Sequence, residues 1–396
     1  MGWLILVVCQ FVFSQRFQFS RRIPPFRACR PYQPLQTNDT IEPFACQREL
    51  ALASNVNDPE ADKSIIQISE ENGYIIQTHT VTTSDGYILT LFRILGGRRS
   101  PVREGKPAVL ILHGWGNSCD SWIALPNDKN LAFMLADTGY DVWLGCLRGT
   151  SFSLGHRTLN FNLDLNYWEF SFHEKGLFDF PAMVDHTRMV SGNEKIFLVA
   201  HSEGGSAFLV ATSEIPDMNE KIRAAFLLAP AAIIGGVTNS FITAILPISG
   251  NRLQRTYPSP RHSESCNSSW FGETNLPRML TKLMDNFNIR TAIHFGSNVR
   301  SCSFRKFDYG TRENFRRYRA ANPPRYNLNR IQTPMYIFWA QQDDTVTPPD
   351  VQRLTNELPS TALREVIRVN DDRFGHTDFI IARDANELKK FLLPQY

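Results

Sequence analysis

Short apolar runs alternate with helix-like amphipathic stretches over the first half of the chain. The apolar runs lie at 107–112, 141–144, 196–200 and 224–228, and the helical stretches between them at 130–136 and 181–190. Strands that alternate with helices require a mostly parallel sheet with helices on both faces. The pattern therefore predicts an α/β fold.

A different pattern precedes these strands. The segment VTTSDGYILTLFRIL, beginning at Val81, alternates polar and apolar residues on both sides of Asp85-Gly86. Alternation with a period of two is typical of strands, and Asp-Gly is a strong turn signal, so we expect an antiparallel hairpin here.

Between Pro230 and Pro334 the alternation breaks down, and it resumes with strand-like runs at 335–339 and 363–369 and a closing helix at 386–393. We expect an insertion that forms a cap, or lid, over one edge of the sheet. The predicted division is a core at 63–232 and 330–396, with the cap at 233–329.

The first residues have another composition. Met1 to Phe13 is an apolar run shorter than the roughly 20 residues that span a bilayer, so we interpret residues 1–20 as a cleaved signal peptide, with an uncleaved anchor as the alternative. Residues 21–62, rich in Arg and Pro, read as a leader. No later stretch is long and apolar enough to span a membrane, which predicts a soluble protein of the secretory route.

Charge and cysteines refine this expectation. A net charge of +3 over 396 residues is too small to indicate nucleic-acid binding. The cysteines beyond the signal peptide are even in number, as expected in an oxidising compartment, and their pairing stays open: Cys29, Cys46, Cys119, Cys146, Cys266 and Cys302. Asn38 and Asn267 begin sequons for N-glycosylation.

The candidate chemistry centres on Ser202. It lies between the apolar run 196–200 and a helix-like segment rich in small residues, where a sharp turn lifts a serine hydroxyl clear of the sheet. Ala200 and Gly204, two residues to either side, are small enough for strand and helix to pass closely. The pattern indicates a nucleophile elbow.

A serine nucleophile requires a base and a carboxylate, which follow in the order Ser, Asp, His in this architecture. Asp343 and Asp344 come after the strand 335–339, and His376 comes after the strand 363–369. We therefore predict Ser202 as nucleophile, His376 as base, and one of the two aspartates as the acid.

A second glycine-containing turn, His113 to Gly116, follows the early strand 107–112. In serine hydrolases of this kind a turn in this position supplies one backbone donor to the oxyanion hole, and the residue after the nucleophile supplies the other. The predicted donors are the N–H groups of Trp115 and Glu203.

With these motifs in hand, the chain resembles the acid lipase family of gastric and lysosomal lipases and their insect and nematode relatives. The resemblance covers about residues 64 to 394 and rests on the segments Gly73–Ile94, Leu110–Ser118, Leu131–Gly149, Tyr167–Asp185, the elbow, Phe307–Tyr318, Asp343–Val351 and Gly375–Ile380. It implies an α/β-hydrolase fold and cofactor-free hydrolysis of triacylglycerols or cholesteryl esters at a lipid–water interface. Aligning Val346 to Val351 with the family motif favours Asp343 as the acid, whereas aligning Trp339 favours Asp344.

Four residues depart from the family pattern: Ala200, Glu203, Cys146 and Cys302. The cysteines suggest disulfides beyond the family's single cap bridge. Glu203 stands where Gln is usual and would place a carboxylate near the oxyanion, so it must be paired, turned away or protonated. We favour protonation.

The residues leave two other functions open. One is a catalytically idle protein of the same fold that binds lipid, since fold does not imply function. The other is an esterase or acyltransferase that uses the same triad.

Overall fold

The computed structural model describes residues 63–125, 129–239, 285–286 and 288–381. The strands are β1 (Ile75–Thr82), β2 (Tyr87–Gly96), β3 (Ala108–Leu112), β4 (Asp141–Cys146), β5 (Gly155–His156), β6 (Ile196–His201), β7 (Ile222–Leu228), β8 (Met335–Trp339) and β9 (Leu363–Arg368). The α-helices are α3 (Ile65–Glu71), α4 (Leu131–Asp137), α5 (Phe172–Glu174), α6 (Phe180–Ser191), α7 (Glu203–Glu214), α8 (Met218–Lys221), α11 (Ile289–Ser301), α12 (Thr311–Tyr318), α13 (Pro348–Glu357) and α14 (Asp378–Ile381). Three 3-10 helices, η1 (Cys119–Ile123), η2 (Leu165–Trp168) and η7 (Leu328–Arg330), and one π turn, η3 (Lys175–Asp179), complete the described elements.

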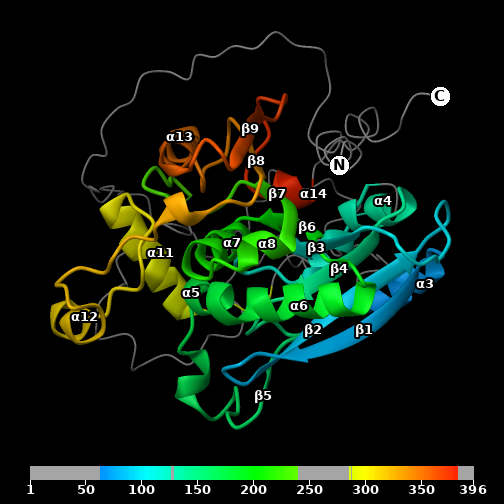
Figure 1. Ribbon diagram of the computed structural model, residues 1–396, viewed down its shortest axis with the longest axis horizontal. Coiled ribbons are helices and arrows are strands. Elements are labelled where there is room, and N and C mark those ends of the chain that lie inside the picture. Colours follow the sequence, from blue (N-terminus) through cyan, green and yellow to red (C-terminus); the bar gives the residue numbers. More distant parts are fainter. Residues whose placement is uncertain (1–62, 126–128, 240–284, 287, 382–396) are drawn as a thin grey trace, which may run out of the picture.

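The strands form one sheet in the order β1-β2-β4-β3-β6-β7-β8-β9, with β5 paired to β2 (Figure 1). The pairs β1–β2 and β2–β4 are antiparallel, and every pair from β4 to β9 is parallel. The predicted hairpin is confirmed, and Gly86 adopts the positive φ of 103° at its turn. The predicted mostly parallel α/β sheet is also confirmed.

Strand order explains where the helices lie. The chain steps from β3 to β4 in one direction and then returns past β3 to β6 and β7. Because crossovers between parallel strands are right-handed, this reversal places α4 on one face of the sheet and α6 and α7 on the other (Figure 1). Ligands of such sheets bind beyond the carboxyl ends of the strands where the order reverses, which here are β3 and β6.

The core lies between the sheet and these helices. Every residue of β3, β4 and β6 is buried, and in β7 only Arg223 is exposed. Strands covered on both faces read as continuous apolar runs, which is why they were recognisable in the sequence. In the described part of the chain, no helix is both long and apolar enough to cross a membrane.

Part of the predicted cap is described. It contains α11 and α12, and α11 and the residue that caps it are hydrogen-bonded to the segment 168–171 of the core. The Asn288 side chain donates to the Trp168 carbonyl at 3.1 Å, and His294 Nδ1 lies 2.9 Å from Ser171 Oγ. The signal peptide 1–20, the leader 21–62, the closing helix at 386–393 and the sequons at Asn38 and Asn267 fall outside the described residues.

Candidate active site

Ser202 stands at a sharp turn between β6 and α7, as predicted. Its φ of 51° and ψ of −114° are strained values for a residue with a side chain. The strain is maintained by close packing, because a Cβ on Gly204 would lie only 2.9 Å from the His113 carbonyl oxygen. Ala200 is fully buried in β6, so the extra methyl group is accommodated.

Three residues that are far apart in the sequence meet at this turn. His376 Nε2 lies 2.9 Å from Ser202 Oγ, and His376 Nδ1 lies 2.9 Å from Asp343 Oδ2. The Asp343 carboxylate is fixed in turn, because its Oδ1 accepts from the backbone N–H groups of Thr345 and Val346 at 2.9 and 2.7 Å. The arrangement is a continuous hydrogen-bonded chain from carboxylate to imidazole to hydroxyl.

Asp344 points elsewhere. Its Oδ2 accepts from the Asn239 side chain at 3.0 Å, and its backbone carbonyl accepts from the N–H of Thr238 at 2.8 Å. Of the two aspartates left open by the sequence, the structure therefore brings Asp343 to His376 and uses Asp344 to anchor the chain where the insertion begins.

The environment of His376 suits a base. Burial acts to lower its pKa, but the attraction of the Asp343 carboxylate, assisted by Asp344, outweighs burial and raises the pKa above its usual value. The neighbouring His201 differs, because burial holds its pKa well below the usual value and keeps the ring neutral. His201 Nε2 lies 3.0 Å from the His376 carbonyl oxygen, so its N–H holds the backbone of the base.

The turn from His113 to Gly116 lies directly beside the elbow. A Cβ on Gly114 would be 3.0 Å from Ser202 Cβ, which explains why glycine is required there. Burial lowers the pKa of His113 to about 3, so its ring is neutral, and its Nε2 accepts from the Leu147 backbone N–H at 3.1 Å. The turn is thereby attached to the chain that follows β4.

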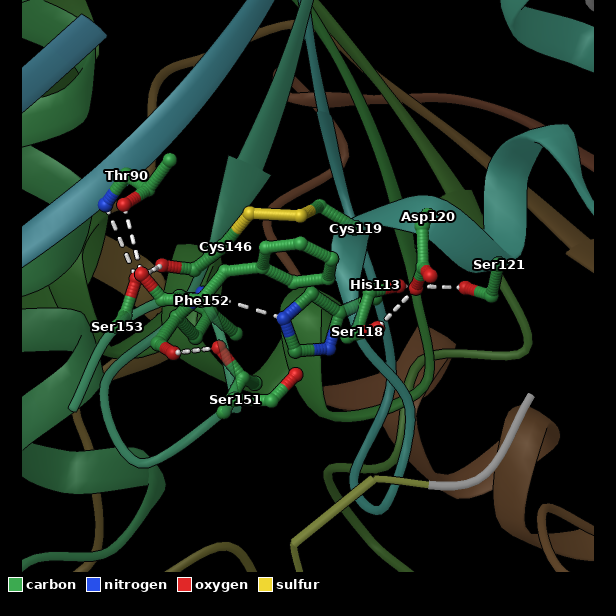
Figure 2. Close-up of a disulfide and its surroundings, with 12 residues drawn as sticks. Thr90, His113, Ser118, Cys119, Asp120, Ser121, Cys146, Ser151, Phe152 and Ser153 are labelled. Atoms are coloured by element: carbon green, nitrogen blue, oxygen red, sulfur yellow. Dashed lines mark hydrogen bonds between the residues drawn. A yellow bond between two sulfur atoms is a disulfide. The ribbon is translucent and has the colours of Figure 1, made fainter. Parts of the chain in front are cut away.

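A disulfide makes a second attachment between the same two segments. Cys119, just beyond the turn, is bonded to Cys146 at the end of β4 (Figure 2). Both cysteines are fully buried, and Cys146 precedes Leu147 directly. Cys302 is also disulfide-bonded. The expected departure from a single cap bridge is thus confirmed, and one of the bridges brackets the turn that carries Trp115.

Glu203 requires a correction. We expected a protonated carboxyl group, but Glu203 Oε2 lies 2.8 Å from the ammonium of Lys175 in a salt bridge. The Glu203 side chain is fully buried, and the ammonium group of Lys175 is its salt-bridge partner. The paired alternative is therefore the one that the structure supports. Sequence reasoning missed Lys175 because nothing in the EKG segment indicates a partner 28 positions away.

Two described residues of the predicted cap, Asp285 and Phe295, contact the turn after β3. The N–H of Asp285 donates to the Gly116 carbonyl at 2.8 Å, and the Asp285 carboxylate accepts from Ser151 Oγ at 2.7 Å. The rings of Trp115 and Phe295 lie 6.3 Å apart.

Among residues 63–125, 129–239, 285–286 and 288–381 there is no group of His, Cys, Asp or Glu side chains arranged to hold a metal ion.

Sheet topology, elbow and hydrogen-bonded triad together define an α/β-hydrolase, and comparison with known proteins gives the class as a carboxylic ester hydrolase. Residues 65–125 match the family described as the partial alpha/beta-hydrolase lipase region, and residues 107–252 match the alpha/beta hydrolase fold. The chain belongs to the family of gastric and lysosomal-type acid lipases.

Three relatives document this membership. Lipase member K of Homo sapiens is 30% identical, with 84% of this chain and 90% of the relative covered. Gastric triacylglycerol lipase of Bos taurus is 30% identical, covering 84% and 91%. Lipase 3 of Drosophila melanogaster is 29% identical, covering 80% and 88%.

Proposed function

We propose that this protein is a secreted or lysosomal lipase that hydrolyses the ester bonds of neutral lipids, triacylglycerols or sterol esters, at a lipid–water interface. The observation that carries the proposal is the unbroken chain of hydrogen bonds through Asp343, His376 and Ser202 beside a glycine turn. The names of the relatives, which include gastric triacylglycerol lipase, support a neutral-lipid substrate.

In the proposed reaction, Ser202 Oγ attacks the ester carbonyl while His376 Nε2 takes its proton. Asp343 keeps the His376 Nδ1 proton in place and stabilises the imidazolium. The raised pKa of His376 favours this proton uptake. His376 then gives the proton to the leaving alcohol, and water, activated by the same ring, hydrolyses the acyl-enzyme.

The developing oxyanion would be held by the backbone N–H groups of Trp115 and Glu203. Glu203 is the first residue of α7, so the positive end of the helix also faces the oxyanion. Removing one such donor costs about 10² to 10³ in rate in comparable enzymes. The residues 233–329 would form the cap, and the ring of Phe295 beside Trp115 contributes apolar surface for an acyl chain.

The test is hydrolysis of emulsified triacylglycerol, emulsified cholesteryl ester and a soluble short-chain ester by the full chain. We expect turnover of at least one emulsified lipid, sharply above the rate on monomeric substrate. Ser202→Ala should abolish turnover and labelling by an active-site phosphonate. Turnover confined to the soluble ester would favour an esterase. Transfer of the acyl group to an added alcohol would favour an acyltransferase. Absence of phosphonate labelling in the wild-type protein would favour a catalytically idle lipid-binding protein.

A further inference from the structure

The segment before α6 lies directly on the elbow helix. Ser171 caps the short helix α5, which runs into the π turn Lys175–Asp179. A Cβ on Gly176 would lie 2.6 Å from Val210 Cβ and 2.7 Å from the Ala207 carbonyl oxygen. The glycine therefore lets the π turn contact α7. Single π turns inside helices are frequent at functional sites.

Lys175 is the first residue of this π turn. Its ammonium lies 2.8 Å from Glu203 Oε2, with the lysine side chain 5% exposed and that of Glu203 0% exposed. The other carboxylate oxygen, Oε1, has no hydrogen-bond partner in the described part of the chain. Burying two charges is costly and is seldom a net gain in stability over apolar residues, so stability alone is a weak explanation for this pair.

The position of the pair suggests another explanation. Glu203 follows the proposed nucleophile directly, and its backbone N–H is one proposed donor to the oxyanion. An uncompensated carboxylate about 6 Å from the oxyanion, at an effective dielectric constant near 20, would slow the reaction by roughly 100-fold. The ammonium group of Lys175 compensates the negative charge of the Glu203 carboxylate. It also holds the Glu203 side chain in place, and with it the backbone N–H that would face the oxyanion.

We propose that Lys175 is a positioning residue for the oxyanion hole: its ammonium neutralises the Glu203 carboxylate and fixes the first turn of α7, which carries the oxyanion donor. The proposal rests on the proposed ester hydrolysis at Ser202. Lys175 does not contact the substrate in this scheme, since it acts through Glu203.

Other charged groups surround the pair. On the segments nearest the elbow they include His113, Arg148, His173, Glu174, Asp179, His201 and His376. Arg148 and Asp179 form their own fully buried salt bridge, and burial keeps His113 and His201 neutral. In the described part of the chain, the salt-bridge partner of Glu203 is Lys175.

The experiment measures two rates on the full chain as a function of pH. One is the second-order rate constant for phosphonylation of Ser202 by a fluorophosphonate. The other is the rate of p-nitrophenyl butyrate hydrolysis, for which kcat and KM are determined with enzyme whose active-site concentration has been titrated. Each variant is compared with the wild type at the same pH, so that the titration of His376 cancels. The variants are Lys175→Met, Glu203→Gln and the double variant.

For Lys175→Met we expect both rates to fall about 100-fold near pH 8, with kcat changed more than KM. The loss should shrink as the pH falls, because burial without a nearby cation favours the uncharged form of a carboxyl group. The double variant, which leaves no stranded charge, should recover most of the loss and show no added pH dependence.

The matched control lies at the other end of α7, where Lys306 forms a salt bridge with Glu214. Lys306→Met also removes a lysine that is paired with a glutamate of α7, and it should leave both rates unchanged. If Lys175→Met is unstable, Lys175→Gln keeps an N–H donor without the charge and should show the same pH-dependent loss.

A Lys175→Met or Lys175→Gln enzyme that reacts as fast as the wild type at pH 8 would overturn the proposal. So would a loss of equal size at every pH, which would indicate a purely structural role. A wild-type protein that fails to react with the phosphonate would overturn the proposed function and this inference together, whereas the two former results would leave the proposed function intact.

Discussion

At the scale of single residues, two adjacent aspartates have separate tasks. Asp343 is bound to His376 and to two backbone N–H groups, while Asp344 is bound to Asn239 and to the N–H of Thr238. Their chemistry is identical and their positions differ by one. Only the direction in which each side chain leaves the loop separates the proposed triad acid from an anchor of the insertion.

Asp343→Asn should lower kcat/KM for a soluble ester by about 10⁴, because the amide stabilises the wrong tautomer of the imidazole. Asp344→Asn should change it by less than about tenfold, since the amide can still accept from Asn239. The measurement is steady-state kinetics of both variants, with circular dichroism to confirm folding. The reverse order of effects would transfer the proposed role to Asp344.

At the scale of elements, two attachments join the turn after β3 to the end of β4. His113 accepts from the Leu147 N–H at the start of the turn, and the Cys119–Cys146 disulfide closes its far side (Figure 2). A turn held at both ends keeps the Trp115 N–H at a constant distance from the elbow. Rigid placement of donors is the main source of oxyanion stabilisation.

Cys119→Ala combined with Cys146→Ala should destabilise the fold by about 3.5 kcal/mol, the loop-closure contribution of a bridge across 27 residues. The free energy of unfolding should be compared by chemical denaturation under non-reducing conditions, with kcat per titrated site measured alongside. We expect kcat to fall as well. Unchanged stability would show that packing alone holds the turn.

At the scale of the whole molecule, buried histidines set the response to acid. Burial lowers the pKa of His113 to about 3 and keeps the pKa values of His201 and His294 well below their usual value. His294 packs on Phe172 with ring centroids 3.9 Å apart. His376 is the opposite case, because its pKa is raised.

The sign of the effect follows from linkage. A histidine with a lowered folded-state pKa contributes stability above its unfolded pKa of about 6.5, and this contribution is lost as the pH falls towards the folded-state pKa. His376 adds stability below about 6.5 and loses it as pH rises through its raised pKa. Among the histidines of the described residues, six have a lowered pKa and one, His376, has a raised pKa, so the titration of the histidines should destabilise the fold in acid.

We therefore expect the melting temperature to decrease steadily from about pH 6.5 to pH 4, an interval set by the histidine reference value. His294→Gln, which keeps hydrogen bonding but cannot titrate, should make this decrease shallower. Thermal unfolding across that range provides the measurement. A melting temperature that is level or rises towards pH 4 would contradict the prediction and would strengthen a lysosomal destination over an extracellular one.

The amino-acid sequence by itself determined the features that depend on neighbours along the chain. The apolar runs predicted the buried strands, Asp85-Gly86 predicted the hairpin, and the small residues around Ser202 predicted the elbow, since each reflects local periodicity or backbone freedom. It also limited the proposed acid to two adjacent residues. These features can be predicted from the sequence because a strand or a turn depends mainly on consecutive residues.

Only the tertiary structure decided which distant groups meet. It brought Asp343 rather than Asp344 to His376, joined Cys119 to Cys146, and placed Lys175 against Glu203 where we had expected a protonated carboxyl group. Each outcome depends on a distance of a few ångströms between side chains on different elements. Such distances follow from strand order and from the path of a π turn, and no spacing along the chain encodes them.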